Sequence, residues 1–318
     1  MKKVFRYVLY LIGASLTLVL IFVLFVQLRG IPTYEPQEAK ITVVSTPEKV
    51  LHGKKLASML CVKCHLDPET NHLTGKFLVD APPIFGKIYS KNITQSKEHG
   101  IANWTDGQIA YLLRTGVRPN GTFIPPYMPK FNRMADYDVE SIIAWLRSED
   151  PMLAANESVP PTSEPSWFTK FLCTVAIKPL PYSNEPISLP DTNDAVAHGK
   201  YLATFQLQCF ACHSKDFAKN NDLQPELSEG FFGGGNPMTD YDGNVVMTAN
   251  ITMDEETGIG TWTEEQFLTA VKTMQTPYGK TLKYPMEPYP MLDDTEVKHI
   301  YAYLKTIPKI KNRVARKQ

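Results

Sequence analysis

Two short stretches decide the fold of this chain: Cys61-Val62-Lys63-Cys64-His65 and Cys209-Phe210-Ala211-Cys212-His213. Each has two cysteines three positions apart and a histidine directly after the second cysteine. The sequence around them is duplicated as well. The matching stretches are His52-Gly53-Lys54 with His198-Gly199-Lys200, Asn92-Ile93-Thr94 with Asn250-Ile251-Thr252, and Trp104-Thr105 with Trp262-Thr263. The chain therefore contains one module twice, and each copy holds one Cys-x-x-Cys-His motif.

The spacing of the cysteines has a chemical reason. Two thiols three residues apart on one helical turn both reach the vinyl groups of one haem and form thioethers, and the adjacent imidazole then binds the iron. Zinc sites and redox-active thiols also use cysteine pairs, but neither requires the following histidine twice. We therefore expect two covalently bound haem c groups. The expected attachment residues are Cys61, Cys64, Cys209 and Cys212, and the expected iron ligands are His65 and His213.

A methionine downstream of each motif is expected to complete the coordination of iron, as it does in class I cytochromes. The candidate in the first module is Met128, between Pro126 and Pro129, and the repeat puts Met286 at the equivalent position. Prolines around both residues stiffen the loops that present them. Three rivals remain. They are Met134 in the first module, Met291 in the second, and His72, which would give bis-histidine ligation but has no counterpart in the second module.

Apolar residues at helical spacing predict a mainly α fold. Thr46 and Pro47 are expected to start a helix that runs into the first motif. Capping boxes are expected at Thr105 to Gln108 and at Thr263 to Gln266. The closing helix of each module has one buried stripe, formed by Val139, Ile142, Ile143 and Leu146 and by Val297, Ile300, Tyr301 and Leu304. With no long alternating pattern for strands, we expect two tandem class I cytochrome c-like domains, each with a few helices and long loops around a haem.

The chain of 318 residues is long enough for two ordinary domains. The expected division is an anchor at 1–30, a first domain at 45–150, a proline-rich linker at 151–190, a second domain at 191–308 and a basic tail at 309–318. Cys173 lies in the linker, within a short apolar patch, and is expected to be a packed thiol rather than a ligand. Because it is the only cysteine outside the two motifs, a disulfide framework is not expected.

The N-terminus has the pattern of a membrane anchor. An almost unbroken apolar run from Val8 to Leu28 is as long as the roughly 20 residues that a spanning helix needs. Lys2, Lys3 and Arg6 precede it, so the positive-inside rule keeps the N-terminus in the cytoplasm. We expect a single-pass protein of the bacterial cytoplasmic (inner) membrane, with its haem domains on the periplasmic side. The alternative is a cleaved secretory signal, which would export the same domains.

The charge balance gives no reason to expect a nucleic-acid partner, because 33 basic residues face 33 acidic ones. The residues described above resemble a known group: the small c-type cytochrome domains in cytochrome subunits of bacterial membrane alcohol, aldehyde and gluconate dehydrogenases. The resemblance covers nearly all of the chain outside the anchor and linker. There are two departures. Such subunits are often trihaem, and Met286 is followed by Glu287 where Met128 is followed by Pro129.

The resemblance implies an electron carrier with no catalytic residues. A dehydrogenase or quinol oxidase would be its donor, and a terminal oxidase or soluble cytochrome its acceptor. The alternative is a dihaem redox enzyme, of the cytochrome c peroxidase or thiosulfate dehydrogenase type, in which one iron opens a position for substrate. The matched methionines speak against it, whereas ligation by Cys173 would favour the thiosulfate reaction. A haem-based sensor is disfavoured because little sequence precedes the anchor.

Overall fold

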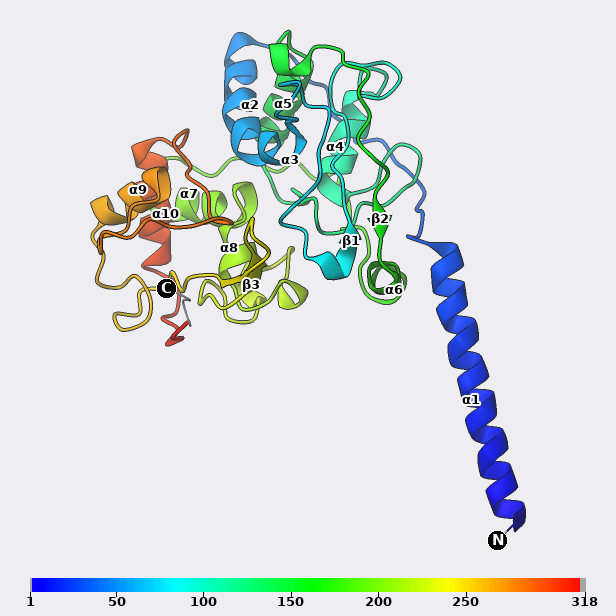
Figure 1. Cartoon of the computed structure of the whole chain (residues 1–318). Coiled ribbons are helices and arrows are strands. Elements are labelled where there is room, and N and C mark those ends of the chain that lie inside the picture. Colours follow the sequence, from blue (N-terminus) through cyan, green and yellow to red (C-terminus); the bar gives the residue numbers. More distant parts are fainter. Residues whose placement is uncertain (1, 315–318) are drawn as a thin grey trace.

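The structure is a computed structural model that describes residues 2–314. It is mainly helical, as the sequence predicts, and Figure 1 shows one long helix standing apart from two groups of helices and loops. The helices are α1 Lys2–Arg29, α2 Pro47–Leu60, α3 Val62–His65, α4 Asp106–Thr115, α5 Asp136–Leu146, α6 Trp167–Val175, α7 Ala195–Tyr201, α8 Cys209–His213, α9 Glu264–Thr273 and α10 Asp294–Leu304.

Shorter elements lie in the loops. The 3-10 turns are η1 Pro83–Phe85, η2 Pro151–Leu153, η4 Phe217–Lys219 and η5 Pro225–Leu227, and η3 Leu202–Gln206 is π-helical. Two antiparallel ribbons pair β1 Gly86–Lys87 with β2 Glu164–Pro165 and β3 Pro237–Thr239 with β4 Val245–Met247. Strands of two or three residues connect neighbouring loops and do not form a core.

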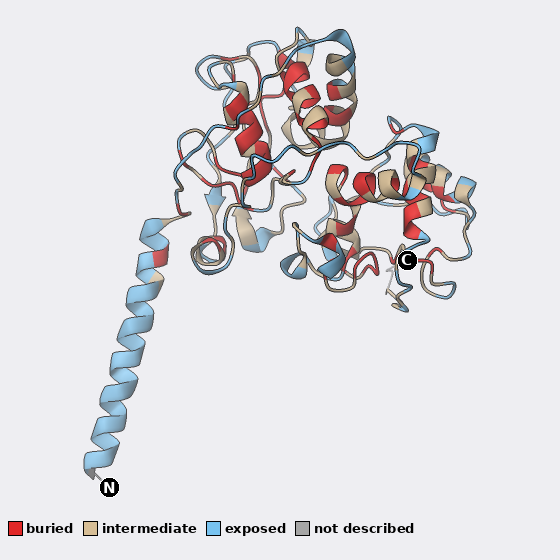
Figure 2. Cartoon of the chain, turned by 180° about the vertical axis from the view of Figure 1, so that it is seen from behind, coloured by how far each residue is buried: buried red, intermediate tan, exposed pale blue. Residues whose placement is uncertain are grey.

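Helix α1 is the apolar helix that the sequence predicts. Its segment Lys3–Arg29 contains an 18-residue window with a mean hydropathy of 2.7 and is long enough to cross a membrane. Figure 2 shows that nearly all of it is exposed, apart from a buried position close to its C-terminal end, which is Val26. A long apolar helix that is exposed along most of its length needs another apolar environment, and lipid provides one.

Each module is built on a close crossing of its first and last helices. Gly53 on α2 lies against α5, and a Cβ added there would be 1.8 Å from the carbonyl oxygen of Ser141. Gly199 on α7 lies against α10 in the same way, with the carbonyl oxygen of His299 also at 1.8 Å from an added Cβ. A side chain at either glycine would push the two helices apart. Both predicted capping boxes are present, at Thr105 and Thr263.

The buried apolar residues form two clusters. The first includes Leu56, Trp145 and Cys173, and the second includes Leu202 and Tyr303. All the residues of the predicted stripes on the two closing helices are buried in these clusters.

The segment expected to be a linker holds regular structure. Leu153 of η2 and Cys173 of α6 are fully buried in the first cluster, and β2 pairs with β1. Much of residues 151–177 therefore packs against the first module. The sequence obscures this because α6 is short and buries only two residues, Thr169 and Cys173, in a stretch otherwise rich in proline and serine.

The two modules differ just before their cysteine motifs. His52 precedes Cys61 by nine positions, whereas His198 precedes Cys209 by eleven. The second module accommodates the two extra residues in the π-helical turn η3 and in Gln208, whose φ is 53°. A π-turn widens a helix locally, and such turns are common where a side chain must be redirected.

Candidate haem-binding sites

Each Cys-x-x-Cys-His motif lies on a short helical turn at the edge of a hydrophobic cluster. In the first module, the amide of His65 donates to the carbonyl oxygen of Cys61 at 2.9 Å, which brings the two cysteines and the histidine onto one turn. In the second module, α8 spans the whole motif, Cys209–His213. Cys61 packs against the first cluster and Cys209 against the second. This is the arrangement that attachment of one haem per motif requires.

The hydrogen bonds of the two histidines fix their tautomers. Nδ1 of His65 lies 2.7 Å from the carbonyl oxygen of Lys91, and Nδ1 of His213 lies 2.8 Å from that of Ala249. Because a carbonyl oxygen only accepts, Nδ1 must carry the proton and the lone pair is on Nε2. Histidines that bind metals commonly have such a second hydrogen bond, which orients the ring. Burial also lowers the pKa of His65, which favours the neutral imidazole that iron binds.

The repeated Asn-Ile-Thr stretch holds the carbonyl groups that orient these rings, because Lys91 and Ala249 directly precede it. In the first module, Oδ1 of Asn92 accepts from the amide and the hydroxyl of Thr94 at 2.9 and 2.7 Å. Asn250 and Thr252 repeat both contacts, at 2.9 and 2.8 Å. Both asparagines are almost fully buried. The sequence reveals the motif through its repetition, but not its role.

A glycine in each module ties the histidine backbone to the same loop. The amide of Gly75 donates to the carbonyl oxygen of His65 at 2.8 Å, and the amide of Gly234 donates to that of His213 at 2.7 Å. Their φ angles are 93° and 68°, which only glycine adopts readily. A Cβ would lie 2.5 Å from the carbonyl oxygen of Ser90 at Gly75, and 2.4 Å from Ala249 at Gly234. Neither position tolerates a side chain without movement of the loop.

The candidate methionines lie in loops with equivalent backbone bonding. The amides of Met128 and Met286 each donate to the carbonyl oxygen three residues before, at 3.3 and 3.1 Å. Each loop is also tied to the helix before it by equivalent bonds, Ile124 to Gly116 at 2.8 Å and Leu282 to Met274 at 2.7 Å. Met128 packs against the first hydrophobic cluster, and Met286 is half-buried. This equivalence supports the pairing of Met128 with Met286 that the repeat suggests.

The rival ligands have less suitable surroundings. Met134 is fully buried in the first core, and its counterpart in the repeat, Leu292, is also a core residue. Met291 is 48% exposed. Nδ1 of His72 bonds to the carbonyl oxygen of Thr70 within a local turn, at 2.7 Å. Met134 and His72 are thus held by contacts within the first module, and Met291 is the most exposed of the three.

The cysteines lack the lowered pKa of redox-active thiols. Burial raises the pKa of Cys61 to about 12, that of Cys64 to about 11 and that of Cys209 to about 12, whereas a reactive thiol needs a lowered pKa. Cys173 is fully buried, and burial raises its pKa to about 11, in agreement with a packed thiol.

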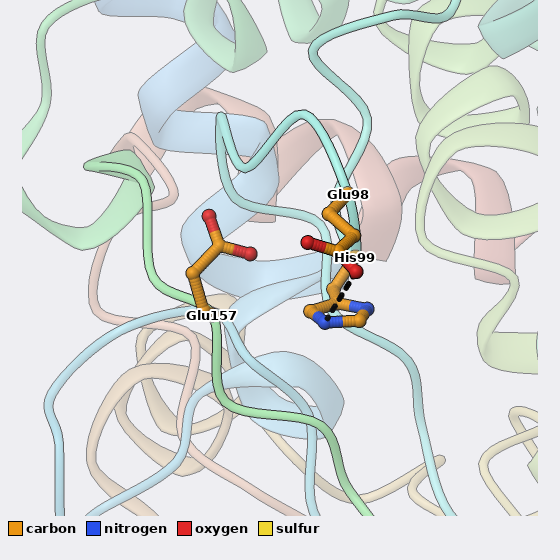
Figure 3. Close-up of side chains that lie close together, drawn as sticks. All are labelled: Glu98, His99 and Glu157. Carbon is orange, nitrogen blue, oxygen red and sulfur yellow. Dashed lines mark ion pairs between the residues drawn. The ribbon is translucent and has the colours of Figure 1, made fainter.

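Among residues 2–314, only one group of three His, Cys, Asp or Glu side chains brings its ligand atoms within 4.8 Å of one another: Glu98, His99 and Glu157 (Figure 3). All three are exposed. Asn92 explains their proximity, because its Nδ2 donates to the carbonyl oxygens of Asn156 and Ser158 on either side of Glu157. The three side chains are thus close because of how this loop is held, and the group contains no cysteine.

The first cysteine motif touches the methionine loop of the second module. Nζ of Lys63 lies 3.5 Å from Oε1 of Glu287 and 5.1 Å from the centre of the Tyr284 ring. A pocket of about 220 Å³ opens beside this contact and is lined by residues of both modules, including Cys64 and Tyr241. The two candidate haem sites are therefore neighbours across the boundary between the modules.

Arg118 is a further residue near the first site that the sequence did not single out. Its charge acts on His65 and lowers the pKa of that imidazole, and burial lowers the pKa of the guanidinium itself. Within the described residues, no ion pair involves Arg118. A half-buried guanidinium of this kind suits a carboxylate supplied by a bound group.

No family model matches the chain, but several curated proteins are similar to it. One is the fructose dehydrogenase cytochrome subunit of Gluconobacter japonicus, with 29% identity over 78% of this chain and 50% of that protein. Others are the alcohol dehydrogenase (quinone) cytochrome c subunit of Gluconacetobacter polyoxogenes, with 26% identity over 79% and 54%, and the gluconate 2-dehydrogenase cytochrome c subunit of Pantoea cypripedii, with 25% identity over 78% and 56%.

The chain spans about half the length of these relatives. They confirm the resemblance inferred from the motifs and, as cytochrome c subunits, imply covalently bound haem c and electron transfer. The chain is thus homologous, over most of its length, to the cytochrome c subunits of fructose, alcohol and gluconate dehydrogenases, and it has an N-terminal helix long and apolar enough to serve as a membrane anchor.

Proposed function

We propose that this chain is a dihaem c-type cytochrome with two tandem class I-like domains. One haem is attached to Cys61 and Cys64 and the other to Cys209 and Cys212. His65 and Met128 bind the first iron, and His213 and Met286 bind the second. The observation that carries this proposal is the duplicated support of the histidines, in which each Nδ1 bonds to the carbonyl group directly before an Asn-Ile-Thr stretch. Such support is expected of an iron ligand in each module.

Haem supplies a one-electron iron couple when it is bound. The chain's part is to hold the groups around it. The carbonyl groups of Lys91 and Ala249 orient the imidazoles, proline-fenced loops hold the thioethers, and Arg118 offers its charge to haem carboxylates. A methionine and a histidine as the two protein ligands would raise the reduction potential and fill the coordination sphere, which would favour electron transfer over substrate binding.

The donor is proposed to be a dehydrogenase or quinol-oxidising partner, and the acceptor a terminal oxidase or soluble cytochrome. Support for the donor comes from the relatives, whose names describe subunits of fructose, alcohol and gluconate dehydrogenases. The haem domains are proposed to lie on the periplasmic side of the bacterial inner membrane, because Lys3 and Arg6 precede the apolar span.

The experiment is to produce the full chain in a bacterium that attaches haem and to count covalent haem per chain by the pyridine haemochrome spectrum. We expect two haems in the parent chain and one in each of the variants Cys61→Ala/Cys64→Ala and Cys209→Ala/Cys212→Ala. Absence of covalent haem from the parent chain would refute the proposal. Ferrous spectra with and without carbon monoxide then test the function. A carrier leaves both haems unchanged, and rapid binding at one haem would instead support a dihaem enzyme.

A further inference from the structure

Helix α6 packs beside the outer end of the membrane anchor. The indole nitrogen of Trp167 donates to the carbonyl oxygen of Val23 at 3.2 Å, and Nζ of Lys170 donates to Oε1 of Gln27, also at 3.2 Å. The rings of Phe22 and Phe171 meet edge to face, with their centroids 6.1 Å apart. Figure 1 shows α6 beside the end of α1 that leads into the first module.

These contacts set the depth of α6 relative to the bilayer. Arg29 is the first charged residue after the apolar span of α1. Val23 lies six residues before it, or roughly 9 Å along a helix that rises 1.5 Å per residue. The head-group region is roughly 5 to 7 Å thick on each side of the hydrocarbon core. Trp167 is therefore level with the boundary between head groups and acyl chains, where tryptophan is enriched in membrane proteins.

The side chains of α6 suit such a position. Thr169 and Cys173 face the protein, and both are buried. Another side of the helix carries apolar side chains that the protein leaves partly exposed: Phe168 is 36% exposed and Val175 is 50% exposed. Ile84, on the neighbouring turn η1, is 57% exposed. With its threonine and thiol side chains turned towards the protein, α6 leaves apolar side chains uncovered beside a spanning helix, where lipid can bury them.

The connection between α1 and α2 is also fixed in place. The amide of Tyr34 donates to the carbonyl oxygen of Gly121 at 2.9 Å, and the amide of Ala39 donates to that of Gly107 at 3.1 Å. The first module is thus attached to the anchor along this connection and again through α6. Two attachments at different points prevent it from swinging about the end of α1.

We propose that α6 is a second membrane contact, an interfacial helix that rests on the outer surface of the bilayer and inserts Trp167, Phe168 and Val175 between lipids. Continuity with the anchor selects lipid as the occupant, because the exposed apolar face extends from the side of a spanning helix. The contact holds the first cysteine motif at a fixed height and orientation over the membrane. This inference goes beyond electron transfer and does not depend on the number of haems.

Photocrosslinking of the full chain tests the proposal. p-Benzoyl-phenylalanine is placed at Phe168 or, in a second variant, at Val175, and the protein is illuminated in vesicles of phosphatidylethanolamine and phosphatidylglycerol. Peptides are then analysed by mass spectrometry. We expect lipid adducts at both positions, as at Leu16 within α1, which is the positive control. Leu227 in the second module is 67% exposed and provides the matched negative control, with no lipid adduct expected.

A lack of adducts at residues 168 and 175, with the adduct at Leu16 present, would overturn the proposal. So would a crosslink from either position to a second polypeptide, since the face would then bind protein. The haem count of the same variants is read separately by the pyridine haemochrome spectrum. A chain that binds lipid through α6 but carries no haem would therefore refute the proposed function and leave the membrane contact standing.

Discussion

One backbone carbonyl group in each module fixes the tautomer of the motif histidine, His65 or His213. Those of Lys91 and Ala249 accept a hydrogen bond from Nδ1, which leaves the lone pair on Nε2, the atom that would bind iron in the proposed function. Neither residue contributes its side chain, which is why the sequence motifs do not reveal them. The signal in the sequence was the asparagine that follows each one, because a buried amide that makes several bonds constrains the backbone on both sides.

We expect Asn92→Ala to destabilise the first module by about 2 to 4 kcal/mol, because it removes four hydrogen bonds from a buried loop and leaves backbone groups without partners. Thermal unfolding of the haem-loaded chain measures this change. Asn103→Ala is the matched control, since Asn103 is exposed and makes a single bond to Lys97. Equal effects of the two substitutions would contradict the role given to Asn92.

Replacement of the proposed methionine ligands should affect one haem at a time. We expect Met128→Ala and Met286→Ala each to lower the reduction potential of one haem and to let carbon monoxide bind it, because the thioether no longer occupies the iron. Redox titration and ferrous spectra measure both effects. Met291→Ala is the control, because Met291 is 48% exposed. If Met291→Ala changes the second haem and Met286→Ala does not, the assignment moves to Met291.

Most of the regular elements follow from the sequence, because strong local signals specify them. Thr105 and Thr263 cap their helices as predicted. Helix α6 was not predicted as an element. Its position depends on packing against α1 and the first core, which are distant in sequence. The π-helical turn η3 was also missed, since an insertion of two residues does not reveal where the backbone accommodates it.

The contact between α7 and α10 should make stability depend on pH. Nδ1 of His198 lies 2.9 Å from Nδ1 of His299, so at least one of the two rings must be neutral. Burial lowers the pKa of His198, and the neighbouring His299 and Lys55 lower it further. Glu296 and Asp138 raise it, but the net shift is downward. As the pH falls through about 6.5, His198 is protonated in the unfolded chain before it is protonated in the folded chain. A lower pH therefore favours unfolding.

We expect the free energy of unfolding to decrease between pH 7 and pH 5, and His198→Gln to make that decrease smaller. Denaturant unfolding at a series of pH values measures the slope. The parent chain, measured under the same conditions, is the control. An identical slope in His198→Gln and the parent chain would show that His198 does not contribute.

At the scale of the whole molecule, the two modules meet through reciprocal contacts. The carboxylate of Asp138 on α5 is buried and accepts hydrogen bonds from Tyr201 and, at 2.6 Å, from Gln206, both of the second module. In the opposite direction, Lys55 on α2 pairs with Glu296 on α10 at 2.7 Å. Lys55 and Tyr201 are equivalent in the repeat, as are Asp138 and Glu296. Gln206 lies in the π-helical turn that only the second module has.

We expect Tyr201→Phe to cost about 1 to 3 kcal/mol, because it removes the hydroxyl that bonds to buried Asp138 and to the amide of Ala135. Calorimetry measures the loss and should also show the two modules unfolding less cooperatively. Tyr137→Phe is the matched control, since its hydroxyl makes only one long contact, 3.4 Å to Glu48. Unchanged stability and cooperativity in Tyr201→Phe would mean that the Asp138 contact does not hold the modules together.

Reciprocal pairing of equivalent positions is the pattern of a two-fold symmetric homodimer, in which each subunit offers the same patch to the other. Here both patches belong to one polypeptide, so their association is intramolecular. Short tethers give effective concentrations in the millimolar range, enough to keep a polar interface of this kind assembled. Dilution in the membrane should therefore leave the spacing of the two cysteine motifs unchanged, whereas two separate subunits joined by the same contacts would come apart.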